Sequence, residues 1–462
     1  MSKSRGTKAR GPSSQVIPPR DGTQPVVSAR PMAGSTEHLT GRYLILIGPE
    51  EASAARAHLN NEAGLSLQSV GGSETLSVGD QSIREGEGVV FHDLGVAVVN
   101  APPDQISAVN AAVAQSSALY LMEPERYVHT YGSVVLDYLR GYRDAVNHLY
   151  DTASKGEQGE QGEQGASTSK TEVVYDESQV SWGLQATRVP DSRFTGKGVK
   201  VAVLDTGLDL THPDFTGRTI VTQSFIAGLG VQDGNGHGTH CCGVACGARR
   251  PQHLPRYGIA YDADLYVGKV LDDNGTGTDA SIIAGIQWAL SQRCDIISMS
   301  LGSAVKQGQA YSAVFQQIAQ RALDRGALII AAAGNDSDRP RGKISPVSHP
   351  ANCPDIFSVA AVDRRLRTAW FSNAGLNPGG GKIDLAAPGM DITSSWPAPD
   401  LYKPLDGTSM ATPHAAGIAA LFLQSAPEAR GRSLWAFLMQ RAKPLSASTK
   451  DVGAGLIQAP LA

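Results

Sequence analysis

The sequence has no apolar run long enough to cross a membrane and no stripe of basic residues. Charged residues make up only 18% of its 462 residues, below the about 25% that is usual for globular proteins. Spanning a membrane takes about 18 consecutive apolar residues. With a formal net charge of −4, neither a membrane nor nucleic acid is expected as a partner.

Cysteine is also scarce, and its number is odd. Five cysteines leave at least one thiol that is free or paired with another chain. Cys241, Cys242 and Cys246 follow His237, but zinc sites usually join two pairs of ligands, and no second pair follows. The N-terminus lacks the apolar core of an ordinary secretory signal, so the location of the protein stays open. The length allows two or three domains.

Glycine, by contrast, is abundant and surrounds two reactive side chains. The segments are DGNGHGTHCCG around His237 and DGTSMATPHAAG around Ser409. Glycine loses more conformational entropy on folding than other residues, so these runs indicate a backbone that approaches something closely. A serine hydroxyl is a weak nucleophile until a base removes its proton, and an imidazole is suited to that task. Ser409 and His237 are therefore a candidate nucleophile and base.

A carboxylate that could orient the imidazole stands at the end of a predicted strand. Residues 201–204 are apolar, and Asp205 follows where the chain turns. A lone Asp at a strand end is usually a turn residue, and a lone Gly-Thr-Ser is usually a loop. Here the three groups occur together in the order Asp205, His237, Ser409, which is the subtilisin order of the catalytic triad.

The chain resembles the subtilisin-like serine peptidases over residues 178–458. Four blocks carry the resemblance: VAVLDTGLDLTHPDF, GHGTHCCGVACG, AAAGND and GTSMATPHAAG. It implies an α/β fold, a parallel sheet with helices on both faces, and a serine endopeptidase that acts through an acyl-enzyme intermediate. Alternating strands and helices from residue 199 onward favour the same fold. Polypeptide substrates, a monomer and chemistry without a cofactor are expected. Members of the family are often secreted.

The resemblance also assigns further site residues. Asn335, after the apolar strand 327–333, would donate to the oxyanion, together with the backbone N–H of Ser409. The residues expected to pair with an extended peptide substrate are Ser300, Leu301, Gly302, Gly275 and Gly277. His240 and His414 are matched to no chemical role and are expected to be packed histidines.

Backbone pairing favours broad specificity, and the base of the primary pocket is expected near Ser348, which carries no charge. Asp336 and Asp338 near the rim leave a processing enzyme selective for Lys or Arg as an alternative. A second alternative is a catalytically silent relative that serves as a binding module. The presence of all three triad residues and Asn335 argues against it.

The rest of the chain divides into three parts. Residues 1–40 are rich in Ser, Pro and Gly and are expected to be disordered. Residues 41–130 show a β-α-β-β-α-β order, typical of a small α+β ferredoxin-like unit, which resembles the inhibitory pro-domain of subtilases; an accessory domain is the alternative. Residues 131–177 combine an amphipathic helix with a flexible GEQGEQGEQG linker. The peptidase domain takes up residues 178–462.

This order of domains predicts a self-inhibited zymogen. The unit at 41–130 would cover the active site as an intramolecular inhibitor. Autocatalytic cleavage between about residues 150 and 178, estimated from the position of the linker, would then release the mature enzyme.

Two departures from the family concern metals and thiols. The stretch GARRPQHLPRYGIA lacks the Asn-rich loop that supplies calcium ligands, although Asp214 matches one ligand of that site. Asp384 matches a second cation position, so structural calcium stays open. Cys241 lies one helical turn after His237, which resembles the thiol-containing, proteinase K-like branch. Inhibition by mercurials through Cys241 is expected, with Cys242 as the next candidate.

Overall fold

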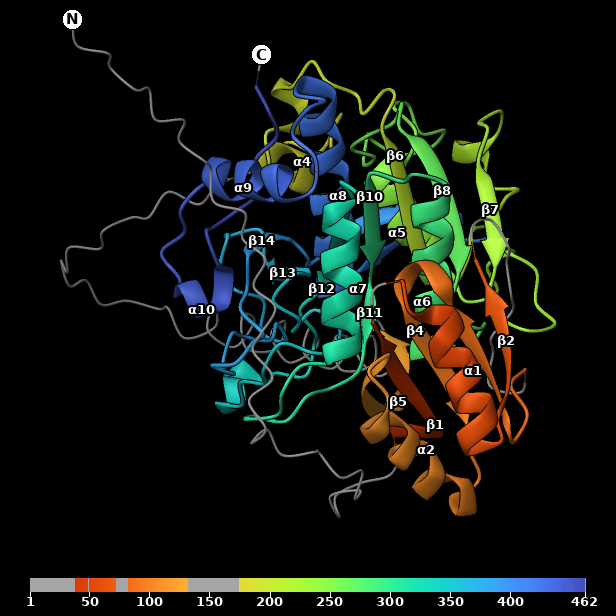
Figure 1. Cartoon of the computed structure of the whole chain (residues 1–462). Helices are drawn as coiled ribbons and strands as arrows, with labels where there is room; N and C mark the ends of the chain where they lie inside the picture. Colours follow the sequence, from red (N-terminus) through yellow and green to blue (C-terminus); the bar gives the residue numbers. More distant parts are fainter. Residues whose placement is uncertain (1–37, 49, 72–81, 132–173, 462) are drawn as a thin grey trace, which may run out of the picture.

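A parallel sheet forms the centre of the larger unit. The computed structural model describes residues 38–48, 50–71, 82–131 and 174–461 (Figure 1). Seven parallel strands lie in the order β14-β13-β12-β10-β6-β8-β7. Their bounds are β6 (Lys200–Asp205), β7 (Val221–Ser224), β8 (Asp264–Lys269), β10 (Ile296–Met299), β12 (Leu328–Ala332), β13 (Phe357–Val362) and β14 (Leu385–Pro388).

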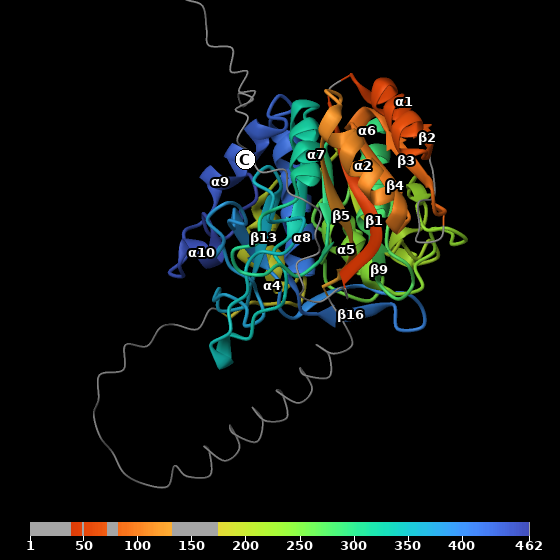
Figure 2. The ribbon, with the colours of Figure 1, turned by 60° about the horizontal axis from the view of Figure 1, so that its bottom comes forward.

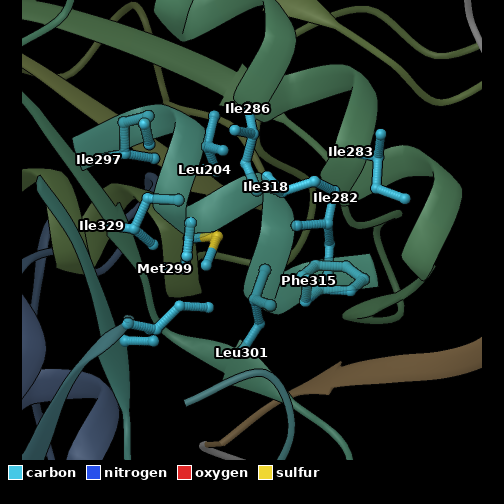
Figure 3. Packing of buried hydrophobic residues seen from close by; sticks show 14 of the residues in the cluster. Leu204, Ile282, Ile283, Ile286, Ile297, Met299, Leu301, Phe315, Ile318 and Ile329 are labelled. Carbon is cyan, nitrogen blue, oxygen red and sulfur yellow. The ribbon is translucent and has the colours of Figure 1, made fainter. Parts of the chain in front are cut away.

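Helices cover both faces of this sheet, as expected for the α/β fold. Successive residues of β6 point to opposite faces: Val201 and Val203 join the apolar cluster of α5 and α8, whereas Ala202 and Leu204 join that of α6 and α7. Figure 3 shows the second cluster, with Ile286 and Ile318 near Leu204. The four helices are α5 (His237–Cys246), α6 (Asp279–Ser291), α7 (Ala313–Asp324) and α8 (Thr408–Ser425).

Shorter elements complete the larger unit. The β15–β16 hairpin packs beside α5, and α9 packs against α8. The remaining bounds are β9 (Thr276–Thr278), β11 (Leu301–Gly302), β15 (Ile392–Ser395), β16 (Tyr402–Leu405), α4 (Trp182–Ala186), α9 (Arg432–Arg441) and α10 (Thr449–Val452). Among the described residues, no helix combines the length and apolar character needed to span a membrane.

The N-terminal unit has the six elements expected from the sequence and one additional strand. Strands β5, β1, β4 and β3 pair antiparallel in this order, and β2 adds to β3 in parallel at the edge. Only two of the five β2 side chains are buried, so its sequence carries little strand signal. The bounds are β1 (Leu39–Ile47), α1 (Ala52–Ala63), β2 (Ser66–Val70), β3 (Glu87–Phe91), β4 (Val96–Asn100), α2 (Pro103–Gln115) and β5 (Leu119–Thr130).

The sheet of the N-terminal unit packs against helices α6 and α7 of the larger unit. Ile45 and Val99 face α1 and α2 within one apolar cluster. Leu44 and Val98 belong instead to the cluster that contains α6 and α7. Figure 2 shows the red and orange N-terminal unit lying against these helices. The expected disordered segment 1–40, except for its last three residues, and the expected helix and linker between residues 132 and 173 lie outside the described residues.

Strand β5 is much longer than the expected strand at residues 118–122. Its first half pairs with β1, and its last residues pair with β9 and β11 of the larger unit. Only tertiary pairing makes this second half a strand, which explains why the local sequence pattern underestimated its length. The extension brings the N-terminal unit to the carboxyl edge of the parallel sheet, where ligands bind in open α/β folds.

Candidate active site

Asp205 and His237 lie in direct contact at the carboxyl edge of the sheet. Asp205 ends β6 and is fully buried, and its Oδ1 lies 2.8 Å from His237 Nδ1. Glycine allows this approach: a Cβ on Gly238 would stand 2.3 Å from the backbone oxygen of Gly207. Gly236, which precedes α5, has a φ of 103° that favours glycine. The glycine-rich motif therefore places the imidazole against the strand end.

Ser409, the second residue of α8, lies beside this pair. Its Oγ donates to the backbone oxygen of Ser300 at 3.2 Å, and Ser300 Oγ donates to Ser409 O at 2.8 Å. Cys241 Sγ contacts both His237 and Ser409. It lies 3.9 Å from His237 Nδ1 and donates to Ser409 O at 3.6 Å. In the described part of the chain, His237 Nε2 has no hydrogen-bond partner. The serine hydroxyl is thus held by Ser300 and not by the imidazole.

Asn335 follows β12, and both the oxygen and the nitrogen of its side-chain amide are hydrogen-bonded. Its Oδ1 accepts from the backbone N and the Oγ1 of Thr408, at 2.9 and 2.8 Å. With Oδ1 held in this way, Nδ2 donates to the backbone oxygen of Tyr131 at 2.5 Å. A Cβ on Gly407 would lie 2.8 Å from the same oxygen. The Tyr131 carbonyl therefore lies between Asn335 and the start of α8.

The end of β5 lies between two strands of the larger unit. Val128 pairs with Gly277, and Thr130 pairs with Leu301, in both cases antiparallel. Thr130 N also donates to Gly275 O at 3.0 Å. The residues expected to hold an extended substrate thus hold a segment of the same chain. The sequence analysis expected residues 41–130 to cover the active site but did not identify the segment that pairs there. Only the high strand propensity of residues 127–131 could have signalled it.

The Tyr131 side chain is buried, and its hydroxyl lies against Gly302. A Cβ on Gly302 would lie 2.3 Å from Tyr131 Oη. Ser348 Oγ donates to Asp336 Oδ2 at 3.0 Å, so Ser348 is joined to a carboxylate. Burial and then the nearby Asp336 raise the pKa of Tyr131 well above its ordinary value. Asp338 instead pairs with Arg341, at 3.2 Å.

Comparison with known proteins decides the family. Residues 196–455 match the model of the subtilase family. This chain is a subtilase. The subtilase is 38% identical over 287 residues to subtilisin BL of Lederbergia lenta, covering 61% of this chain and 98% of that protein. It is 37% identical over 295 residues to an alkaline protease of Alkalihalobacillus alcalophilus, covering 63% and 72%. The protein is a serine-type endopeptidase with polypeptide substrates.

The thiols of this subtilase are all buried. Each of its five cysteines is free. Burial, followed by the nearby Asp205 carboxylate, raises the pKa of Cys241 well above its ordinary value, so the thiol stays protonated. Of the described residues, Asp205, His237 and Cys241 are the group whose possible metal-ligand atoms lie within 4.8 Å of one another. Cys242 and Cys246, considered for zinc in the sequence analysis, are not part of that group.

The two other histidines near the motifs are packed, in agreement with the sequence analysis. His240 Nε2 lies 2.9 Å from Ile392 O, and burial lowers the pKa of His240 to about 3. His414 Nδ1 lies 2.7 Å from Met410 O, and burial lowers the pKa of His414 to about 4. Both rings are therefore neutral in the folded subtilase at physiological pH.

The two carboxylates considered for calcium have protein partners. Asp214 accepts from Tyr257 OH at 2.5 Å and from Gln252 N at 3.2 Å. Asp384 lies 3.2 Å from Lys382 Nζ and accepts from Ser358 N at 2.8 Å. Asp384 Oδ1 is buried and, among the described residues, accepts no hydrogen bond, so the Lys382 ammonium is the charge that stands beside it.

Proposed function

We propose that Asp205, His237 and Ser409 are the catalytic triad of this peptidase. His237 accepts the Ser409 proton through Nε2 as Oγ attacks the substrate carbonyl carbon, and then gives that proton to the leaving amine. The 2.8 Å contact with Asp205 keeps the other imidazole proton on Nδ1 and stabilises the imidazolium. The Ser409 hydroxyl must first leave Ser300 O, to which it donates in this state.

Asn335 is the proposed side-chain donor to the oxyanion that forms in this attack. The observation that carries the proposal is its 2.5 Å contact with the carbonyl oxygen of Tyr131. That carbonyl lies beside the N-terminus of α8, where free backbone N–H groups favour negative charge. Removing one such donor typically lowers turnover by about 100- to 1,000-fold.

We further propose that the protein is made as a self-inhibited zymogen. The end of β5 lies where the substrate residues are expected, and its last described carbonyl contacts Asn335. This geometry favours the bond between Tyr131 and Gly132 as the first to be cut. The cut expected between residues 150 and 178 has no comparable support. After cleavage the N-terminal unit would still block the site.

Buried charges support the inhibitory role of the N-terminal unit. The Arg42–Glu125 pair, 2.5 Å apart and buried, meets the larger unit at the start of α6, where Ala280 N donates to Glu125 Oε1 at 2.9 Å. Glu123 accepts from Ser312 Oγ and Ala313 N at the start of α7. Carboxylates at helix N-termini are stabilising, so the units fit each other in charge as well as in shape.

The test compares the purified wild-type chain with Ser409→Ala and with the control Ser425→Ala, a serine at the far end of the same helix. We expect intact mass spectrometry to find a cut after Tyr131 in the wild type and the control only. Once the cleaved N-terminal unit has been removed, a serine-directed fluorophosphonate should label the processed wild type and not Ser409→Ala. Equal processing of all three chains would contradict self-cleavage. Absence of labelling would favour the silent binding module.

A further inference from the structure

A buried carboxylate outside the proposed triad joins two of the elements that carry it. Asp233 is only 3% exposed and belongs to the glycine-rich segment before α5. Its Oδ1 accepts from Thr206 Oγ1, Asn235 N and Gly236 N at 2.9, 3.0 and 2.8 Å. Its Oδ2 accepts from the backbone N and the Oγ1 of Thr239 at 2.8 and 2.7 Å. Asp233 therefore connects the loop after β6 to the first turn of α5.

Helix α5 depends on acceptors from outside because its N-cap residue has no side chain. Gly236 occupies that position, and a Cβ there would stand 2.4 Å from a tryptophan ring. The first N–H groups of a helix have no partner within it. Here Gly238 N donates to Thr206 Oγ1 at 2.8 Å, and Thr239 N donates to Asp233 Oδ2. Thr206 and Asp233 thus replace the missing capping side chain.

The same bonds fix the position of the imidazole against its carboxylate. Thr206 follows Asp205 directly, and Thr206 N donates at 2.8 Å to the Asp205 oxygen that contacts His237 Nδ1. His237 is the first residue of α5. Asp233 bonds to Thr206 on one side and to backbone N–H groups before and after His237 on the other. A shift of α5 against β6 would therefore break bonds to Asp233.

The bonding pattern at Asp233 requires a carboxylate. Each of its five partner atoms donates. An ionised carboxylate is an acceptor only, with lone pairs on both oxygens. An asparagine would place an NH2 group against donors on one side, so it could not keep all five bonds. Asp233→Asn therefore changes the hydrogen bonds while keeping the size of the side chain.

We propose that Asp233 is a positioning residue that holds His237 against Asp205. The carboxylate acts through Thr206 and the first turn of α5, and it does not touch the reacting atoms. Without it, the imidazole would leave the orientation in which Nε2 receives the serine proton. The inference rests on the proposed function, since it assumes that Asp205 and His237 act together in catalysis.

The first readout is the rate at which the full chain processes itself, followed by intact mass spectrometry. We expect Asp233→Asn to lower this rate by about 100-fold, the effect of a misplacement of about 1 Å in an active site. Thr206→Val should also lower it, and Thr206→Ser, which keeps the hydroxyl, should recover most of the loss. The control is Asp295→Asn, which should keep the wild-type rate. Asp295 is a buried carboxylate that accepts from Lys200 N at the opposite end of β6.

The second readout separates positioning from a loss of stability. In the Ser409→Ala background, which should not process itself, the proton between His237 Nδ1 and Asp205 should give a far-downfield resonance in proton NMR. Its absence in His237→Gln assigns it. We expect Asp233→Asn to shift or broaden this resonance and Asp295→Asn to leave it in place. A loss of stability alone would lower the melting temperature and leave the resonance unchanged.

The outcomes separate this inference from the proposed function. A wild type that neither processes itself nor reacts with the fluorophosphonate would overturn the proposed site. Self-processing of Asp233→Asn at the wild-type rate would overturn the positioning role and leave the triad intact, as would a slower rate with an unchanged resonance. If Asp233→Asn does not fold, the two Thr206 variants decide, and equal rates for both would overturn the inference.

Discussion

The two units of this protein use buried polar residues in different ways. In the described part of the N-terminal unit, Arg42 and Glu125 are the buried polar side chains, and both contact the larger unit. The larger unit buries many, and those of the proposed site, such as Asp205 and Ser409, gather at one edge of its sheet. The N-terminal unit thus places its buried charges at the contact with the larger unit, whereas the larger unit gathers buried polar groups around the proposed site.

The largest expected effect concerns the larger unit alone. Asp205→Asn keeps the shape of the side chain but removes the charge that orients His237 at 2.8 Å. We expect kcat to fall by about 10⁴-fold because the imidazole adopts the wrong tautomer. The rate at which the variant processes itself, compared with the wild-type rate, measures this. An unchanged melting temperature would show that the fold survives, and a loss below tenfold would contradict the role of Asp205.

A smaller effect is expected in the contact between the units. Glu125→Gln leaves the Arg42 guanidinium buried without its carboxylate partner. Losing one member of a buried charge pair typically costs about 2–5 kcal/mol. The inhibition constant of the cleaved N-terminal unit should therefore rise by roughly 30-fold or more. Inhibition of the mature enzyme by the cleaved unit measures this. Arg56→Gln on the exposed face of α1 is the control, and equal weakening by both variants would contradict the prediction.

Acid should weaken the larger unit through its buried histidines. The pKa of His414 is about 4 in the folded state, against about 6.5 when unfolded. Between these values the unfolded chain binds more protons, so the free energy of unfolding falls as pH falls from about 6.5 to 4. Urea unfolding of Ser409→Ala measures this, and His414→Gln should reduce the decrease. An identical decrease in both chains would assign it to other groups.

The smallest effect is expected from a chelator. Lys382 Nζ lies 3.2 Å from Asp384, and Asp214 is bonded to Tyr257. Because both carboxylates already have protein partners, EDTA should leave the melting temperature unchanged. Differential scanning calorimetry with and without EDTA measures this, and a clear decrease would restore a calcium site.

Much of the larger unit could be predicted because its signals are local. A buried apolar run such as 201–204 predicts a strand by itself, and glycines beside His237 indicate a close approach whatever the partner. In the N-terminal unit six elements were predicted from their patterns, but β2 was missed because it buries few side chains. The length of β5 was underestimated, since its partners β9 and β11 lie far along the chain.

The family and the alternating elements could be recognised from short motifs and local patterns alone, and the same motifs led to the proposal of Asp205, His237, Ser409 and Asn335 as site residues. The packing of the two units alone places the Tyr131 carbonyl on Asn335 and the end of β5 between β9 and β11. These contacts join residues far apart in the chain. Their register depends on how two sheets pack through α6 and α7, and no local pattern records that packing.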